Sequence, residues 1–151
     1  MAEPTVRQRL EDDLKSAMRA GDATTRDAVR YILAAVKNAE IDARGSSAPA
    51  DVDAALRRLR KQLADAIEQY RAAGRDDLAT REAGQLAVLE RYLPQELSEE
   101  ELAALVTAAI AETGAAGPKD MGRVMPAAIA RAAGRADGRR ISAAVKSALA
   151  G

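Results

Sequence analysis

The chain has 151 residues, and its 23 Lys and Arg residues balance 23 Asp and Glu residues, so its formal net charge is zero. A neutral chain has no overall attraction to nucleic acid, so any basic surface must be local. There is no cysteine and no histidine, which excludes disulfides and metal sites built from thiolate or imidazole ligands.

Apolar residues recur at helical spacing along the chain, and no segment shows the sustained alternation of a strand. Thr5 and Gln8 form a candidate capping box for a first helix, which we expect to end at Gly21. Thr24 is the expected cap of a second helix, which fades near Gly45.

Two more helices complete the first part of the chain. Asp51 is placed to cap a long third helix, for which Gly74 is the natural end. The fourth helix is expected to run from about Asp76 to Leu93, because Pro94 cannot continue it. These four helices predict a helical hairpin or bundle.

The composition changes after Pro94, where we place a domain boundary. Ser98 and Glu101 form a second capping box, for a helix that ends at Gly114. Pro118 suits the first turn of the next helix, and Pro126 is expected to kink that helix or break it into two pieces.

The predicted fold class is therefore all-α, with about seven helices and no sheet. Residues 1–94 form the expected N-terminal helical hairpin or bundle, and residues 95–151 form a small three-helix C-terminal domain. The C-terminal helices carry few large apolar residues, so we expect a small core there.

Charge is divided unevenly in the C-terminal part. Residues 94–114 hold five glutamates and no cation, a net charge of −5. From Ala115 onward seven Lys and Arg residues face only Asp120 and Asp137, so seven minus two leaves +5.

Two of these cations stand at an unusual place for their charge. Arg139 and Arg140 follow Asp137, the candidate cap of the last helix, although the start of a helix carries partial positive charge. Such local violations often mark functional sites. Two interpretations stay open: a site for an anion such as RNA phosphate, or ordinary surface arginines.

Several segments of the chain resemble the YqeY family. The C-terminal signature of that family is similar to Asp120–Met125 followed by Gly134–Gly138. Further similar segments, in the order of the family, are Asp13–Met18, Lys37–Asp42, Ala73–Leu78, Tyr92–Pro94 and Leu97–Leu102. Ala133 stands where the family commonly has lysine, and Pro126 lies earlier than usual, which leaves fewer cations at that edge.

This resemblance implies an all-helical protein whose C-terminal domain is similar to the tail domain of the GatB subunit of tRNA-dependent amidotransferases, a module that contacts tRNA. We therefore expect tRNA backbone to be held by cations of this domain, with glycines that allow close approach. The expected nucleic-acid-binding residues are Lys119, Arg123, Arg131, Gly134, Arg135, Gly138, Arg139 and Arg140. Because the chain lacks Phe and Trp on which unpaired bases stack, a structured RNA suits it better than a single strand.

The expected function is that of a non-catalytic tRNA-binding or tRNA-metabolism accessory module, related to glutamine-dependent amidotransferases, which are carbon-nitrogen ligases. No catalytic pattern, metal site or cofactor site is recognisable in the sequence. The alternative is a protein-protein adaptor that uses the N-terminal helices and makes no nucleic-acid contact. No run approaches the ~20 apolar residues that span a bilayer, and no signal peptide is recognisable, so we expect a cytoplasmic protein.

Overall fold

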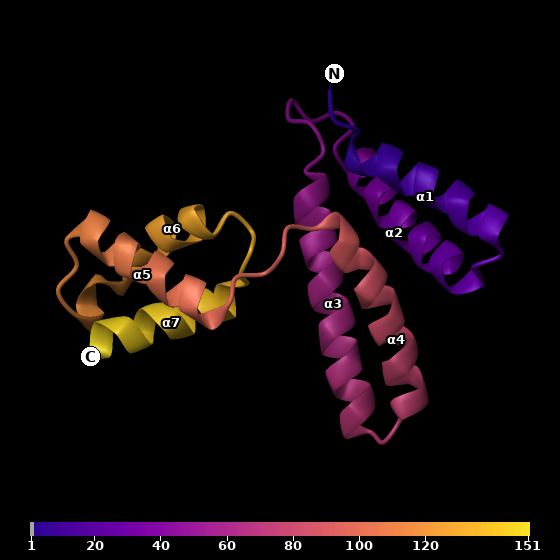
Figure 1. Ribbon diagram of the computed structural model, residues 1–151. Coiled ribbons are helices and arrows are strands. Elements are labelled where there is room, and N and C mark those ends of the chain that lie inside the picture. Colours follow the sequence, from indigo (N-terminus) through magenta and orange to yellow (C-terminus); the bar gives the residue numbers. More distant parts are fainter. Residues whose placement is uncertain (1) are drawn as a thin grey trace. The chain divides into compact units, whose positions relative to one another are not determined.

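The computed structural model describes residues 2–151, in which seven α-helices and two short 3-10 helices form the regular structure, with no strand (Figure 1). The all-α prediction is thereby confirmed. The helices are α1 (Val6–Ala20), α2 (Ala23–Asp42), α3 (Val52–Ala72), α4 (Asp76–Leu89), η1 (Glu90–Tyr92), α5 (Glu99–Thr113), η2 (Pro118–Asp120), α6 (Met121–Ala132) and α7 (Gly138–Ala150).

Most helix starts follow from local side-chain caps. Four predicted caps are confirmed, because the side chain of each accepts a hydrogen bond from the backbone N–H three residues on, at Thr5, Asp51, Ser98 and Asp137. The prediction that Thr24 caps α2 is wrong. Asp22 caps this helix instead, with the Thr25 N–H at 3.1 Å, because aspartate is the stronger cap and comes first after the turn at Gly21.

Two predictions about proline need correction. α4 ends at Leu89 rather than Leu93, and Leu93 is extended, at φ −114° and ψ 152°, as the residue before a proline prefers to be. Of the kink or break expected at Pro126, the break is absent, since α6 runs unbroken from Met121 to Ala132, and the kink stays a prediction. Pro126 leaves the carbonyl of Gly122 without its helical donor, but Gly122 is exposed, so water can reach that carbonyl.

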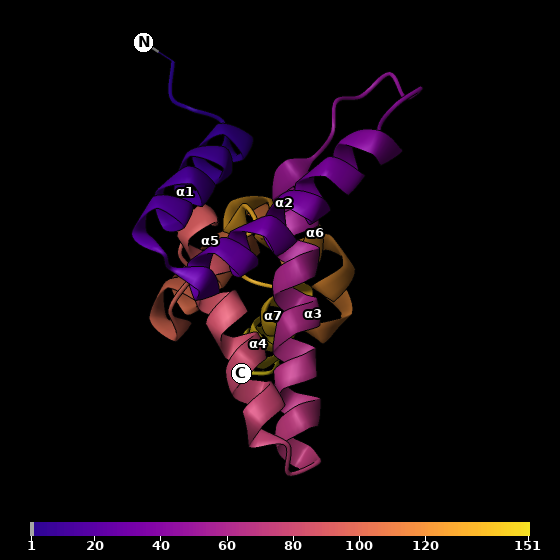
Figure 2. The same ribbon diagram turned by 90° about the vertical axis from the view of Figure 1, so that its right-hand side faces the viewer.

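The described chain divides into two compact units, one up to Leu93 and one from Pro94 onward. In the N-terminal unit α1 packs on α2, α3 and α4 form a long hairpin, and α2 packs against both helices of that hairpin (Figure 2). Burial of apolar side chains holds these helices together. The core residues are Leu10, Ala28, Val29, Ile32, Leu33, Val36, Leu56, Leu59, Leu63, Val88, Leu89, Tyr92 and Leu93.

In the C-terminal unit each of α5, α6 and α7 packs against the other two. The core of this unit contains four alanines, which bury little area and let the helices approach closely. Its members are Leu97, Leu102, Val106, Ala109, Val124, Ala128, Ala132, Ala136, Ile141, Val145 and Leu149. The arrangement is compact but rests on few large side chains.

The turn after α6 contains a residue in an unfavourable backbone conformation. Ala133 has φ 49° and ψ 41°, the left-handed region, where a side chain costs roughly 1–2 kcal/mol. We therefore expect Ala133→Gly to stabilise the C-terminal unit by about 1 kcal/mol, after allowance for the greater freedom of glycine in the unfolded chain.

Denaturant unfolding followed by far-ultraviolet circular dichroism measures this change. The matched control is Ala130→Gly, an exposed position inside α6, where the same substitution is expected to destabilise by about 1 kcal/mol. If Ala133→Gly and Ala130→Gly lowered the free energy of unfolding equally, the backbone at Ala133 would not be strained.

Candidate nucleic-acid interface in the C-terminal unit

A tight turn leads from α6 into α7 and contains much of the predicted site. Gly134, at φ 80°, follows Ala133 in the left-handed region, so glycine is needed there for the backbone itself. Asp137 then caps α7, accepting a hydrogen bond from the Arg140 N–H at 2.8 Å. Gly138 has open space where a Cβ would lie.

Two predicted RNA-binding arginines hold the segment that leads into α5. The Arg135 carbonyl accepts a hydrogen bond from the Leu97 N–H at 2.8 Å, and its Nε donates to the Gln95 carbonyl at 2.8 Å. Arg140 Nη2 donates to the Leu97 carbonyl at 2.8 Å and pairs with Glu99 at 2.8 Å. We call these contacts the entry clamp. They satisfy backbone groups that secondary structure leaves unpaired.

Two other predicted arginines contact the opposite end of α5. Arg123 Nη1 donates to the Thr113 carbonyl at 3.2 Å, and Arg131 Nε pairs with Glu112 at 3.0 Å. A helix as long as α5 spans roughly 22 Å at 1.5 Å per residue. The fold therefore separates Arg123 and Arg131 from the entry clamp.

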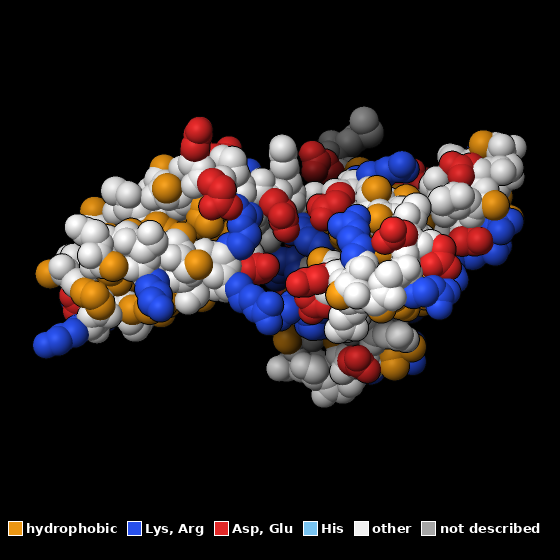
Figure 3. All heavy atoms as spheres, turned by 90° about the horizontal axis from the view of Figure 1, so that it is seen from below, with side chains coloured by type: hydrophobic (Ala, Val, Ile, Leu, Met, Phe, Trp, Pro, Cys, Tyr) orange, Lys and Arg blue, Asp and Glu red, His pale blue; other side chains and the backbone are white. Residues whose placement is uncertain are grey.

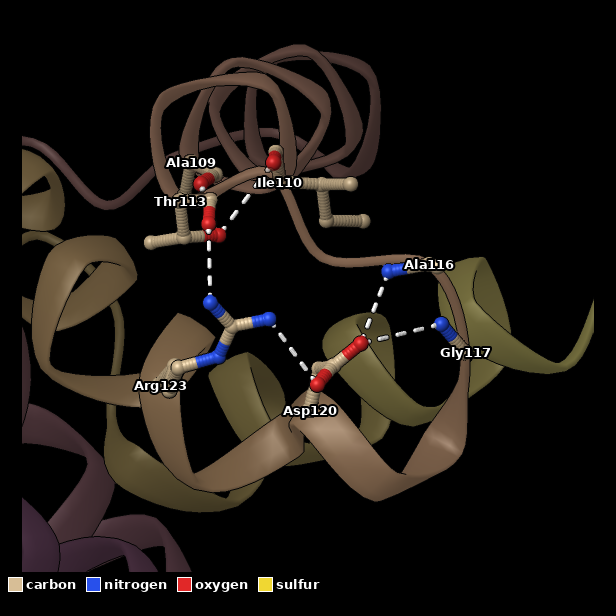
Figure 4. Close-up of polar contacts among 7 residues, drawn as sticks. All are labelled: Ala109, Ile110, Thr113, Ala116, Gly117, Asp120 and Arg123. Carbon is tan, nitrogen blue, oxygen red and sulfur yellow. Dashed lines mark hydrogen bonds and ion pairs between the residues drawn. The ribbon is translucent and has the colours of Figure 1, made fainter.

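The carboxylate of Asp120 accepts hydrogen bonds from backbone N–H groups of the turn before α6 (Figure 4). Its carboxylate accepts hydrogen bonds from the Ala116 N–H at 2.8 Å and the Gly117 N–H at 3.4 Å, and it pairs with Arg123 at 2.9 Å. The hydrogen bond from Ala116 and the guanidinium of Arg123 hold the pKa of Asp120 below its ordinary value. These donors, which resemble an anion site, are already used by the chain's own carboxylate.

The folded state lowers the pKa of Asp120, so the ionised carboxylate stabilises the fold. This stabilisation is fully present above the pKa of the carboxyl group in the unfolded chain, about 3.9, and is lost as the pH falls through the lower pKa of the folded state. We expect Asp120→Asn to lower the melting temperature at about pH 7, and the difference from the unmodified protein to narrow below about pH 4. Thermal unfolding across this pH range measures the effect.

Asp137→Asn is the control for this experiment, because asparagine caps a helix as well as aspartate does. A difference between Asp120→Asn and the unmodified protein that stays constant down to about pH 3 would contradict the assignment.

The charge excess of the predicted site is balanced within the C-terminal unit. Residues 115–151 carry +5 and residues 94–114 carry −5, so the unit is neutral. Three ion pairs join the two segments: Arg131 with Glu112 at 3.0 Å, Arg135 with Glu101 at 3.8 Å, and Arg140 with Glu99 at 2.8 Å. Figure 3 shows one face of the molecule, and at its left separate Lys and Arg side chains lie among apolar, uncharged and acidic ones.

The sequence contained a signal of this balance, namely equal and opposite charges in adjacent segments of one small unit.

Among residues 2–151, Lys119 in η2 and Arg139 at the start of α7 make no ion pair and no side-chain hydrogen bond, and both are exposed. Arg123 keeps 59% of its side chain exposed despite its pairing with Asp120. Of the predicted set, these three cations are the most available to a ligand.

Comparison with known proteins decides the family. The family described as "Yqey-like protein" matches residues 7–149, nearly the whole chain. The chain belongs to this family. The resemblance expected from the motifs is thus confirmed.

This Yqey-like chain is also similar to fungal proteins named "Altered inheritance of mitochondria protein 41, mitochondrial". It is 37% identical to that of Saccharomyces cerevisiae S288c over 87 residues, which are 57% of this chain and 47% of the relative. It is 35% identical to the protein of that name from Candida glabrata over 88 residues, which are 57% of this chain and 48% of the relative. The matched part spans about half the length of these relatives.

Other kinds of site have little support in the Yqey-like structure. No group of three or more acidic, cysteine or histidine side chains in the described part is placed to hold a metal ion. None of its described helices is long and apolar enough to cross a membrane. Four of the nine residues that line a hollow of about 500 Å³ between α5 and α7 are alanines, and its charged members, Glu99 and Arg140, pair with each other.

Proposed function

We propose that this Yqey-like protein is a non-catalytic accessory module that binds structured RNA, with tRNA as its ligand, through the C-terminal unit. The observation that carries this proposal is that Lys119 and Arg139 of the predicted set are exposed and, within the described residues, form no ion pair. Arginine and lysine at such positions gain energy from phosphate through counterion release. The similarity of the C-terminal motifs to the GatB tail supports tRNA as the ligand.

We propose different roles for different members of the predicted set. Lys119, Arg139 and the exposed Arg123 are the proposed phosphate contacts, and Arg131 is a further contact where phosphate displaces Glu112. Arg135 and Arg140 position the chain through the entry clamp, so their loss acts on RNA indirectly. Gly134 forms the turn, and Gly138 leaves room for a phosphate at the start of α7.

A gel-shift titration with total tRNA, repeated over a salt series, tests the proposal. The double variant Lys119→Glu/Arg139→Glu is expected to weaken binding several-fold and to make it less dependent on salt, by about one unit of slope for each lost phosphate contact. The matched control is Lys15→Glu/Arg71→Glu, which changes the same charge at exposed positions of the N-terminal unit. Unchanged tRNA affinity of the first variant would overturn the proposal.

A second candidate function is that of a protein-protein adaptor. It is favoured by large apolar side chains that remain exposed on α1 and α2, namely Met18 at 54%, Tyr31 at 43% and Ile41 at 52%. Exposed apolar groups of this kind are common at partner surfaces when they lie together. Protein that co-purifies with the chain and survives nuclease treatment would favour the adaptor, whereas recovered tRNA favours RNA binding.

Two finer expectations belong to the same proposal. The chain is proposed to assist glutamine-dependent carbon-nitrogen ligation on tRNA rather than to perform it. Its proposed location is the cytoplasm, although the fungal relatives are named as mitochondrial proteins.

A further inference from the structure

A group of arginines on the N-terminal unit lies outside the predicted site. Arg26 and Arg30 are four residues apart on α2 and therefore lie on one face of that helix. Both line a hollow of about 150 Å³ at the turn between α1 and α2, beside the exposed Met18. Like charges at this spacing repel each other, so the pair destabilises the isolated helix slightly.

The tertiary structure adds arginines from other elements to this face. α2 packs against α4, and a hydrogen bond from Arg26, together with the charges of Arg30 and of Arg81 on α4, lowers the pKa of Asp27. The charges of three arginines from two helices thus act on one carboxylate. Arg26 alone pairs with it directly, at 2.8 Å.

The same face continues at η1. A hydrogen bond from Thr25 and the charge of Arg91 in η1 both lower the pKa of Asp22. Arg9 of α1 donates to the Arg91 carbonyl at 2.9 Å and lies over the ring of Tyr92, 5.2 Å from its centre. The hydroxyl of Tyr92 donates to Asp13.

Five arginines make up this surface. The arginine face consists of Arg9, Arg26, Arg30, Arg81 and Arg91. Its charges act on the carboxylates of Asp22 and Asp27, and Tyr92, over whose ring Arg9 lies, donates to Asp13. Within the described residues, Arg30, Arg81 and Arg91 have no direct ion pair and no side-chain hydrogen bond. In the C-terminal unit, by contrast, most arginines are paired by the fold.

From this arrangement we infer that the arginine face of the N-terminal unit is a second contact surface for the phosphate backbone of structured RNA. Guanidinium groups hold phosphate oxygens with two parallel hydrogen bonds, and cations spread over α1, α2, α4 and η1 suit a continuous backbone better than a single small anion. The inference takes its ligand class from the proposed function, but it concerns a different unit and different residues.

The test uses the full chain with Arg30→Gln/Arg81→Gln/Arg91→Gln, and total tRNA as the probe. Binding is expected to weaken at least about tenfold at low salt, and the salt slope to fall by about two to three units. These arginines also interact with the carboxylates of Asp22 and Asp27, so a small decrease in the melting temperature is expected, and binding is measured well below it. Far-ultraviolet circular dichroism equal to that of the unmodified protein at that temperature separates lost phosphate contacts from lost folding. Lys15→Gln/Lys37→Gln/Arg71→Gln removes the same charge from dispersed exposed positions and is expected to bind normally.

Comparison with the C-terminal variant distinguishes the two proposals. Loss of affinity in the arginine-face variant alone would support this inference and overturn the C-terminal site. Unchanged tRNA affinity in the arginine-face variant would overturn the inference, whatever the C-terminal variant does. Polyglutamate is the probe for an acidic protein. If the arginine-face variant loses affinity for polyglutamate but keeps its affinity for tRNA, the surface fits an acidic protein, and the inference is overturned.

Discussion

Replacement of Leu102 with alanine is expected to unfold the C-terminal unit at ambient temperature or to bring it close to unfolding. Leu102 is only 1% exposed and lies in a core where few large side chains contribute. Truncation of a buried leucine costs about 2–5 kcal/mol. A core in a unit as small as Pro94–Gly151 rarely supplies more than about 3–5 kcal/mol, so the loss is comparable with the whole stability of the unit.

The positions of the tyrosines make this prediction easy to measure. Tyr31, Tyr70 and Tyr92 all lie in the N-terminal unit, and the chain has no other aromatic residue. Near-ultraviolet signals of tyrosine therefore report on that unit alone, whereas far-ultraviolet circular dichroism reports helices of both units. The Leu102→Ala protein is expected to lose helical signal at lower denaturant concentration while the tyrosine transition stays in place.

Leu105→Ala is the matched control, because this leucine lies on the same helix but is only partly buried, and a smaller loss is expected. Leu56→Ala, at a fully buried position of the N-terminal core, is expected to shift the tyrosine transition instead. A shift of both signals by Leu102→Ala would show that the two units unfold as one.

Replacement of Arg140 with alanine is expected to destabilise the C-terminal unit by about 1–3 kcal/mol, the range for lost hydrogen bonds to a charged donor. Arg140 keeps only 26% of its side chain exposed and donates to the Leu97 carbonyl in the entry clamp. Its removal leaves that carbonyl without this donor. Far-ultraviolet unfolding curves again give the change.

Two variants separate the contacts that Arg140 makes. Glu99 is 86% exposed, and such ion pairs contribute about 0–1 kcal/mol, so Glu99→Ala is expected to cost much less than Arg140→Ala. Arg139→Ala removes the neighbouring cation that has no partner and is expected to change stability by less than about 0.5 kcal/mol. Equal costs for Arg140→Ala and Glu99→Ala would mean that the carbonyl contact contributes nothing.

Local sequence features predicted much of the secondary structure. Capping at Thr5, Asp51, Ser98 and Asp137 depends on atoms three residues apart, so the residue types alone indicated it. The cap of α2 was missed because Asp22 and Thr24 are both cap-forming residues within the same turn. The early end of α4 and the absence of a break at Pro126 were not predicted, because the preference of a proline for a helix end depends on its surroundings.

The candidate site was less predictable for a different reason. The positive charge after Ala115 was visible in the sequence, but its partners were not. Arg135 meets the Gln95 carbonyl across 40 positions of the chain, and Arg140 meets the Leu97 carbonyl across 43. The arginine face was missed altogether, since Arg26 and Arg81 share no motif and come from separate helices.

The sequence by itself determined the all-α class, four of the helix caps and the family, because these depend on interactions between near neighbours or on ordered motifs. Only the tertiary structure decided which cations remain available. It paired Arg131, Arg135 and Arg140 with the glutamates of α5 and left Lys119 and Arg139 exposed. The physical reason is that charge pairing depends on distances between helices, and packing of the apolar cores sets those distances.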